Sequence, residues 1–147
     1  MKTVIIYASM HHGNTQKVVE SIGQKYEVDL IDVLKDKDTD ISGYDCIGIA
    51  SGIIYGKYYP QMLDYLSTKM PKEKKVFFIH TAGGPKEKHN AEAKAITDRL
   101  GCQCLGTYLC KGYDTYGPWK VIGGINKKHP NNDDFSKAQA FYSDIIG

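Results

Sequence analysis

Five short apolar segments, each followed by a loop and most by a helical pattern, constrain the fold of this chain more than any other feature. The segments cover residues 4–8, 28–31, 46–50, 76–79 and 104–109. Continuous apolar runs are typical of strands buried on both faces. Strands that alternate with helices predict an α/β fold with a doubly wound, five-stranded parallel sheet. Such sheets bind ligands at the carboxyl ends of their strands.

Length and composition narrow the class of protein. A chain of 147 residues with 41% hydrophobic and 24% charged residues is typical of one globular domain, so we expect a single domain over residues 1–147. A net charge of +2 and the lack of a basic tract argue against nucleic acid as a partner. We also expect no membrane span, because no apolar run approaches the roughly 20 residues that a bilayer requires.

The cysteines and the N-terminus bear on the compartment. The cysteines are Cys46, Cys102, Cys104 and Cys110, and their spacing is not the paired CxxC of a zinc site. We interpret them as reduced core thiols. The apolar run after Met1 is too short for a secretory signal. A cytoplasmic protein is therefore expected.

The loop after the first strand carries residues expected of an anion site. It reads Ser9, Met10, His11, His12, Gly13, Asn14 and Thr15, and it opens a helix whose N-terminus is partly positive. Because the motifs of triphosphate and dinucleotide sites are both missing, a mononucleotide phosphate remains. Two alternatives stay open. Asn14 or Thr15 serves only as a helix cap, and the two histidines line the loop without donating to a phosphate.

The pattern Ser-x-x-x-Gly-Asn-Thr in residues 9–15 resembles the phosphate loop of flavodoxins, which commonly reads Ser/Thr-x-Thr-Gly-x-Thr. The order of strands and helices resembles that family over nearly the whole chain. The resemblance implies a flavodoxin-like fold with strand order 2-1-3-4-5 and FMN as the cofactor. The sequence departs from the usual pattern by one additional residue and by two histidines before the glycine, as in related small flavodoxin-like proteins.

The segment after the third strand reads Ser51, Gly52, Ile53, Ile54, Tyr55 and Gly56. In flavodoxins an aromatic residue followed by glycine packs here against the isoalloxazine ring, so the resemblance implies that Tyr55 and Gly56 contact the flavin. The alternative is that Tyr55 is an ordinary surface aromatic. Lys57 stands where many flavodoxins carry an acidic residue, and a cation near the ring would stabilise the anionic reduced flavin.

Two further segments complete the predicted site. Thr81, Ala82, Gly83 and Gly84 follow the fourth strand, and the resemblance implies that their backbone reads the pyrimidine edge of the flavin; the alternative is a plain Gly-Gly-Pro turn. A long loop from residue 111 to about 132 contains Tyr113, a further candidate flavin contact. This loop either covers the flavin and shapes a pocket for a small organic acceptor, or covers a sheet edge.

Three functions follow from these features. We favour an FMN-binding electron carrier that exchanges electrons with a redox partner protein, because no side chain stands out as a general acid or base. The first alternative is an FMN-dependent reductase or dehydrogenase acting on a small-molecule electron acceptor such as a quinone. The second is a flavin-free interaction module on the same fold. No catalytic residue and no metal site is assigned, and the oligomeric state stays open.

Overall fold

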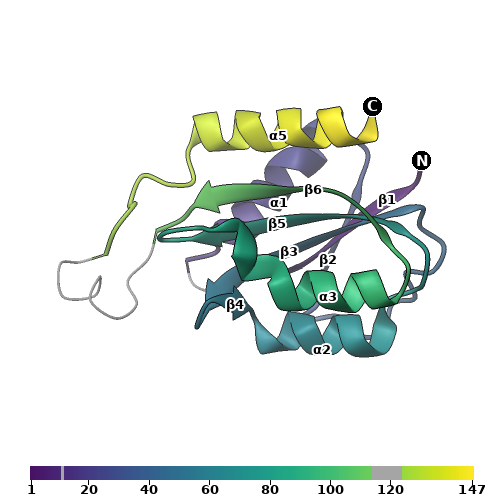
Figure 1. The fold of residues 1–147 in the computed structure, drawn as a ribbon. Coiled ribbons are helices and arrows are strands. Elements are labelled where there is room, and N and C mark those ends of the chain that lie inside the picture. The colour runs from purple at the N-terminus through teal and green to yellow at the C-terminus, as the bar shows by residue number, and fades with distance from the viewer. Residues whose placement is uncertain (11, 114–123) are drawn as a thin grey trace.

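The structure is a computed structural model that describes residues 1–10, 12–113 and 124–147. Its strands are β1 (Thr3–Ala8), β2 (Asp29–Asp32), β3 (Cys46–Ile54), β4 (Lys57–Tyr58), β5 (Lys75–Ala82) and β6 (Gln103–Lys111). Its helices are α1 (Asn14–Lys25), α2 (Pro60–Lys69), the 3-10 helix η1 (Glu87–Asn90), α3 (Ala91–Arg99) and α5 (Asn132–Ile146). Figure 1 shows these elements along the chain.

The sheet has the predicted topology. Its main strands lie in the order β2-β1-β3-β5-β6 and are parallel, which is the order 2-1-3-4-5 when the five long strands are counted along the chain. The short strand β4, which pairs antiparallel with the end of β3, was not predicted from the sequence. The doubly wound, flavodoxin-like α/β fold is therefore confirmed, with one short antiparallel strand added.

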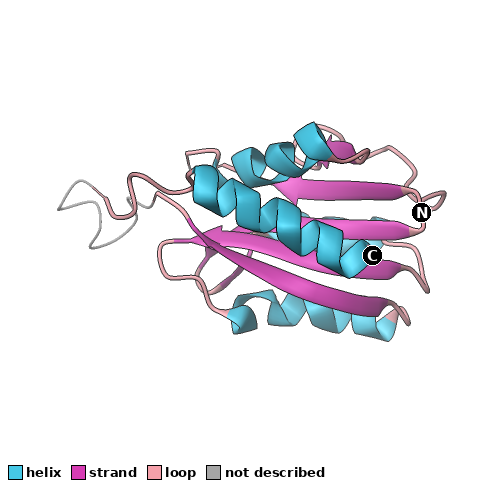
Figure 2. Cartoon of the chain, turned by 90° about the horizontal axis from the view of Figure 1, so that it is seen from above, coloured by secondary structure: helices cyan, strands magenta, loops and turns pink. Residues whose placement is uncertain are grey.

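Helices cover both faces of the sheet. Figure 1 shows α1 and α5 on one face and α2 and α3 on the other, and Figure 2 shows α5 lying across the strands. Side chains of β1 alternate between the two cores: Val4 and Ile6 pack on the α2 side, and Ile5 packs on the α1 side. All three are fully buried. Burial of one such side chain stabilises the fold by about 1.5–3 kcal/mol, which explains why the strand has no polar face.

Two predicted segment boundaries are wrong in an informative way. The segment after the third strand was expected to be a loop from Ser51, but β3 continues to Ile54. The pairs Ile53–Tyr58 and Ile54–Lys57 extend the strand into a hairpin. Thr81 and Ala82 likewise belong to β5, because they pair with the end of β6. The predicted site segments thus begin as strand ends and become irregular only afterwards.

The start of α5 shows how its sequence sets a helix end. The Asn131 side chain accepts a hydrogen bond from the Asp134 N–H, and the Asp134 carboxylate accepts one from the Asn131 N–H. This reciprocal pair is a capping box. Asp134 therefore helps to cap the helix, and the N-cap residue is Asn131.

The cysteines are all free of disulfide bonds. Cys46 and Cys110 are buried, and burial raises the pKa of their thiols to about 11 and about 12. These two are core thiols that stay protonated at neutral pH. Within the part of the chain that the structure describes, no helix has the length and apolar character needed to cross a bilayer.

Candidate functional site

A polar hollow lies at the carboxyl ends of β1, β3 and β5, beside the N-terminus of α1. Nine of the residues that line it were predicted from the sequence: Ser9, Asn14, Thr15, Gly52, Ile53, Thr81, Ala82, Gly83 and Tyr113. Tyr59 also lines the hollow and was not predicted. The parallel topology brings these ends together, although the residues lie far apart in the sequence. Both chain termini lie at the opposite end of the sheet (Figure 1).

The first loop leaves the N-terminus of α1 open. His12 and Gly13 both adopt left-handed backbone conformations, with φ of 57° and 66°. Gly13 occupies the N-cap position without a side-chain cap, and the first turn of α1 carries no acidic residue. Asn14 and Thr15 lie inside the helix, so the alternative that either caps it is wrong. Unpaired N–H groups and the helix dipole at such an end favour an anion.

Ser9, which directly follows β1, supports this helix end. Its Oγ accepts a hydrogen bond from the Gln16 N–H at 3.1 Å. One of the orphan N–H groups of the helix is thereby satisfied, while the cap position remains without a side chain. Met10 next to it is 49% exposed. His11, the other predicted member of this loop, lies outside the described residues.

Thr15 and Thr81 connect the start of α1 to the end of β5. Their hydroxyl oxygens lie 2.8 Å apart, and both side chains are buried. Either hydroxyl can be the donor of this bond, and the other then keeps its own proton free for a further acceptor. The pair can therefore donate a hydrogen bond to an anion or a polar ligand in the hollow.

Asn14 leaves a buried acceptor unused. Its amide Nδ2 donates to the Tyr113 carbonyl at 2.8 Å. Its Oδ1 is buried and has no hydrogen-bond partner among the residues that the structure describes. An unsatisfied buried acceptor costs about 1–3 kcal/mol. A ligand that donates a hydrogen bond at this point would remove that cost.

Two glycines are required by close approaches at the hollow. A Cβ at Gly112 would lie 2.5 Å from Asn14 Nδ2, and a Cβ at Gly52 would lie 2.5 Å from Tyr59 Oη. Tyr59 is itself almost fully buried, and its N–H donates to Ser51 Oγ. The buried Ser51 side chain thus supports the wall of the hollow. Neither Tyr59 nor Gly112 was predicted, because only the fold brings their partners near them.

The tip of the β3–β4 hairpin projects from this end of the sheet. Tyr55 and Gly56 have φ of 51° and 75°, the left-handed values of a two-residue type I′ turn. The Tyr55 side chain is 93% exposed, and Ile54 next to it is half-buried. Lys57 forms an ion pair with Glu92 on α3, with Nζ and Oε1 2.8 Å apart. That carboxylate offsets the positive field that the sequence analysis assigned to Lys57.

His80 supports the segment 81–84 and was not predicted as a site residue. Its Nε2 lies 2.7 Å from the Lys86 carbonyl, and its Nδ1 lies 2.9 Å from Tyr58 Oη. A carbonyl can only accept, so Nε2 carries the proton and the tyrosine donates to Nδ1. Burial lowers the pKa of His80 to about 4. His80 is therefore neutral and links β5 to the Lys86 carbonyl, which follows the Gly83–Gly84 turn.

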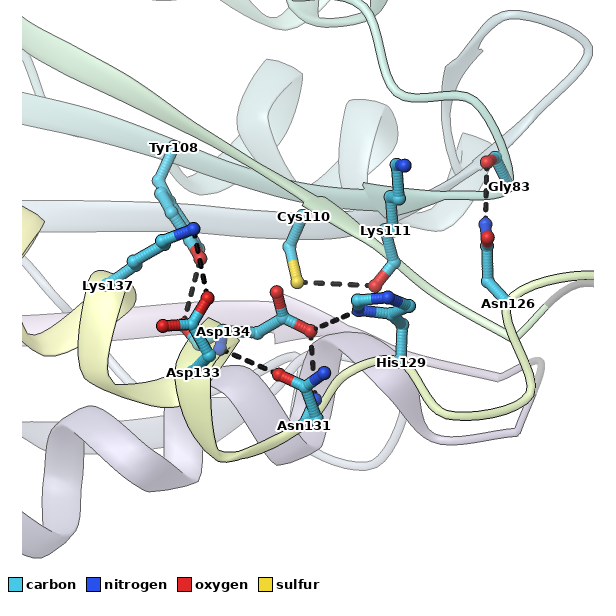
Figure 3. Close-up of polar contacts among 10 residues, drawn as sticks. All are labelled: Gly83, Tyr108, Cys110, Lys111, Asn126, His129, Asn131, Asp133, Asp134 and Lys137. Carbon is cyan, nitrogen blue, oxygen red and sulfur yellow. Dashed lines mark hydrogen bonds and ion pairs between the residues drawn. The ribbon is translucent and has the colours of Figure 1, made fainter.

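The long loop meets the site at both of its described ends. Near its start, the Tyr113 ring stacks on His12 with centroids 4.0 Å apart. Near its return, Asn126 Nδ2 donates to the Gly83 carbonyl at 2.7 Å (Figure 3). Residues 114–123 lie outside the described residues, so the question whether they cover a ligand or a sheet edge stays a prediction.

Comparisons with known proteins agree with this arrangement. The flavodoxin domain model matches residues 4–121. An uncharacterized protein of Methanocaldococcus jannaschii is similar over its whole length, with 38% identity over 148 residues and 99% of both chains covered.

Two solved structures share the fold. A flavodoxin from the domain Archaea has a TM-score of 0.71 at 17% identity, covering 99% of this chain and 96% of its own. A flavoprotein from Lactobacillus acidophilus, solved in complex with FMN, has a TM-score of 0.55 at 21% identity and covers 74% and 92%. At such identities the likeness concerns the fold alone.

Proposed function

The chain belongs to the flavodoxin-domain family, and from that premise we propose that it binds FMN and carries electrons to or from a redox partner protein. The observation that supports this most is the open N-terminus of α1 beside the Thr15–Thr81 hydroxyl pair. A phosphate monoester needs such a concentration of donors and partial positive charge. A helix whose N-terminus is capped by a side chain would not leave these donors available to a phosphate.

The residues around the hollow fit the rest of FMN. The buried Asn14 Oδ1 needs a donor, and the ribityl chain of FMN carries hydroxyl groups that can donate. The backbone of Ala82 and Gly83 lines the same hollow. Backbone N–H and C=O groups there suit the alternating donors and acceptors of a pyrimidine ring. Bound FMN supplies reversible one- and two-electron chemistry, while the protein binds and orients it.

A carrier is favoured over an enzyme because the side chains at the site hold structure instead of offering protons. Both ring nitrogens of His80 are engaged, and its pKa of about 4 keeps it neutral. The hydroxyls of Thr15 and Thr81 bond each other. General acid–base catalysis needs a group whose pKa lies near the working pH and which reaches the substrate. The described hollow offers a binding surface more than a catalytic one.

One observation favours the alternative of an FMN-dependent reductase. Tyr113 lines the hollow and begins the long loop, so the loop leaves the sheet at the mouth of the site. A small acceptor such as a quinone would then bind between this loop and the flavin.

Kinetics with a small acceptor separate the two functions. The holoprotein is reduced anaerobically with dithionite, freed of excess reductant and mixed with 1,4-benzoquinone at increasing concentration. A carrier gives an observed rate that rises linearly with quinone, because no binding site saturates. Saturation at micromolar quinone that is lost in Tyr113→Ala would overturn the carrier in favour of the reductase.

A further inference from the structure

Five exposed lysines gather beside the candidate site at the ends of β5 and β6. This lysine rim consists of Lys86, Lys88, Lys111, Lys127 and Lys128. Glu87 is the one acidic residue within residues 83–88, 111–113 and 124–131. Five lysines against one glutamate give these segments a charge of +4, whereas the whole chain carries +2. The remaining residues therefore carry −2, and the positive charge is concentrated at one place.

The charges of the rim lysines are not neutralised by acidic side chains of the described residues. None of the five forms an ion pair within the residues that the structure describes, in contrast to Lys57, which pairs with Glu92 of α3. Their side chains are exposed to solvent. Clustered free charges of one sign create a local field that attracts the opposite sign over about one Debye length.

Hydrogen bonds fix the place of Lys127 and Lys128. Both lie inside a turn that is closed by the His129 N–H donating to the Asn126 carbonyl at 2.8 Å. Asn126 also ties this turn to the Gly83 carbonyl. His129 Nδ1 lies 2.6 Å from Asp134 Oδ2 at the start of α5 (Figure 3). The turn is thus anchored to the third site segment at one end and to a helix at the other.

Lys86 and Lys111 sit on anchored backbone as well. The Lys86 carbonyl receives the His80 hydrogen bond, and the Lys86 N–H donates to His89 Nδ1 at 3.1 Å. Lys111 is the last residue of β6 and pairs with Ala82 of β5. The rim therefore surrounds the Ala82–Gly83 wall of the hollow in a fixed arrangement.

We propose that the lysine rim docks an acidic face of the redox partner protein against the site. This inference rests on the proposed carrier function and adds the charge of the partner. Fixed positive charge at the point of electron exchange raises the association rate with an acidic protein and suppresses encounters with basic ones. A polynucleotide is the less suitable occupant, because the rim is compact and the rest of the chain is net negative.

The test compares two charge reversals of equal size. Lys127→Glu with Lys128→Glu alters the rim, and Lys72→Glu with Lys75→Glu alters two exposed lysines at the opposite end of β5. Each FMN-loaded protein is mixed by stopped flow with a reduced, acidic 2[4Fe–4S] ferredoxin, which passes an electron from its cluster to the oxidised flavin. The rate is measured at about 20 and about 300 mM salt, and FMN affinity is measured separately.

For the unaltered protein, the rate with the ferredoxin should fall about tenfold between the two salt concentrations. The rim reversal should lower the rate at low salt about tenfold, whereas the control reversal should change it less than twofold. Equal effects of the two reversals, or a rate insensitive to salt, would overturn the rim as a docking surface.

Two further readouts separate the possible failures. Normal FMN binding with no rim effect removes this inference alone, whereas a chain that binds no FMN removes the proposed function itself. Retention of a single-stranded 20-mer oligonucleotide at about 150 mM salt, lost only in the rim reversal, would assign the rim to nucleic acid and overturn the acidic protein partner.

Discussion

The two sides of the candidate site differ in how firmly they are held. On the α1 side, the buried Asn14 and Thr15 bond to residues 99 and 66 positions away along the chain. On the other side, the tip of the β3–β4 hairpin leaves Tyr55 93% exposed. Hydrogen bonds between distant parts of the chain thus hold the side chains at the start of α1, whereas only the pairing of β3 with β4 holds the hairpin tip.

The base and the tip of the hairpin differ in the same way. Tyr58 in the base is buried and donates to His80, which holds the Lys86 carbonyl in turn. Tyr55, three residues earlier, has none of this support. The site therefore combines buried, hydrogen-bonded side chains at the base of the hairpin with the exposed ring of Tyr55 at its tip. This arrangement allows a flat ring to enter and stack on the tyrosine.

The largest expected effect comes from the side chains at the start of α1. The substitution Thr15→Val should lower FMN affinity about 50-fold, or about 2.3 kcal/mol, because it removes a hydroxyl that can donate to the phosphate and a hydrogen bond to a charged group contributes about 1.5–3 kcal/mol. Riboflavin lacks the phosphate, and its affinity should fall far less. Calorimetric titration with both flavins measures the two losses, and Gln24→Ala at the far end of α1 serves as control. Equal losses for the two flavins would show that this helix end does not read phosphate.

The next largest effect concerns His80, which supports the segment 81–84. Burial lowers the pKa of His80 to about 4, so between pH 6.5 and 4 the unfolded chain binds a proton that the folded protein does not. Stability due to this group is present above pH 6.5 and is lost as the pH falls. From pH 7 to pH 5 the loss is about 2 kcal/mol.

Urea unfolding of the protein and of His80→Gln at both pH values tests this. The variant should lose about 2 kcal/mol less stability on acidification, because glutamine does not titrate. An NMR titration of the unaltered protein gives an independent check: the His80 ring should stay neutral at pH 5. A midpoint near 6.5 would place the ring in water.

A smaller effect is expected where the backbone approaches Asn14. In Gly112→Ala the new methyl group would lie 2.5 Å from Asn14 Nδ2 and would push the amide out of place. FMN affinity should fall about tenfold, or about 1.4 kcal/mol. The matched control is Gly43→Ala, because no atom lies within 4 Å of that Cβ and Gly43 does not line the hollow. If both alanines change the affinity alike, the close approach is not what places Asn14.

The smallest effect belongs to the exposed tip. Tyr55→Ala should lower the affinity about threefold, since an aromatic contact contributes about 0.5–1.5 kcal/mol. The loss should be the same for FMN and riboflavin, because the ring is common to both. Unfolding in urea should change by less than about 0.5 kcal/mol at so exposed a position. A loss confined to FMN would instead place Tyr55 near the phosphate and not beside the flavin ring.

The sequence predicted the frame of the fold because its signals are local. The apolar runs that contain Val4 and Val76 determine the buried strands, and nine lining residues follow from the rule that ligands bind at strand ends. The β3–β4 hairpin escaped prediction because Tyr55, unlike asparagine or aspartate, seldom adopts a left-handed conformation.

The missed residues depend on contacts that only the folded chain creates, most of them distant in the sequence. His80 meets Tyr58 across 22 positions, and Asn126 meets Gly83 across 43. Tyr59 is identified only by the space that Gly52 leaves for it. No periodicity or turn signal encodes such pairs, since each is created when the strands align.

The central claim is that the open end of α1 binds the phosphate of a mononucleotide flavin. Calorimetric titration of the apoprotein with FMN and with riboflavin tests it most directly. We expect one site per chain and an affinity for FMN at least about 100-fold tighter than for riboflavin, or about 2.7 kcal/mol. No heat with FMN, or equal affinity for the two flavins, would contradict it.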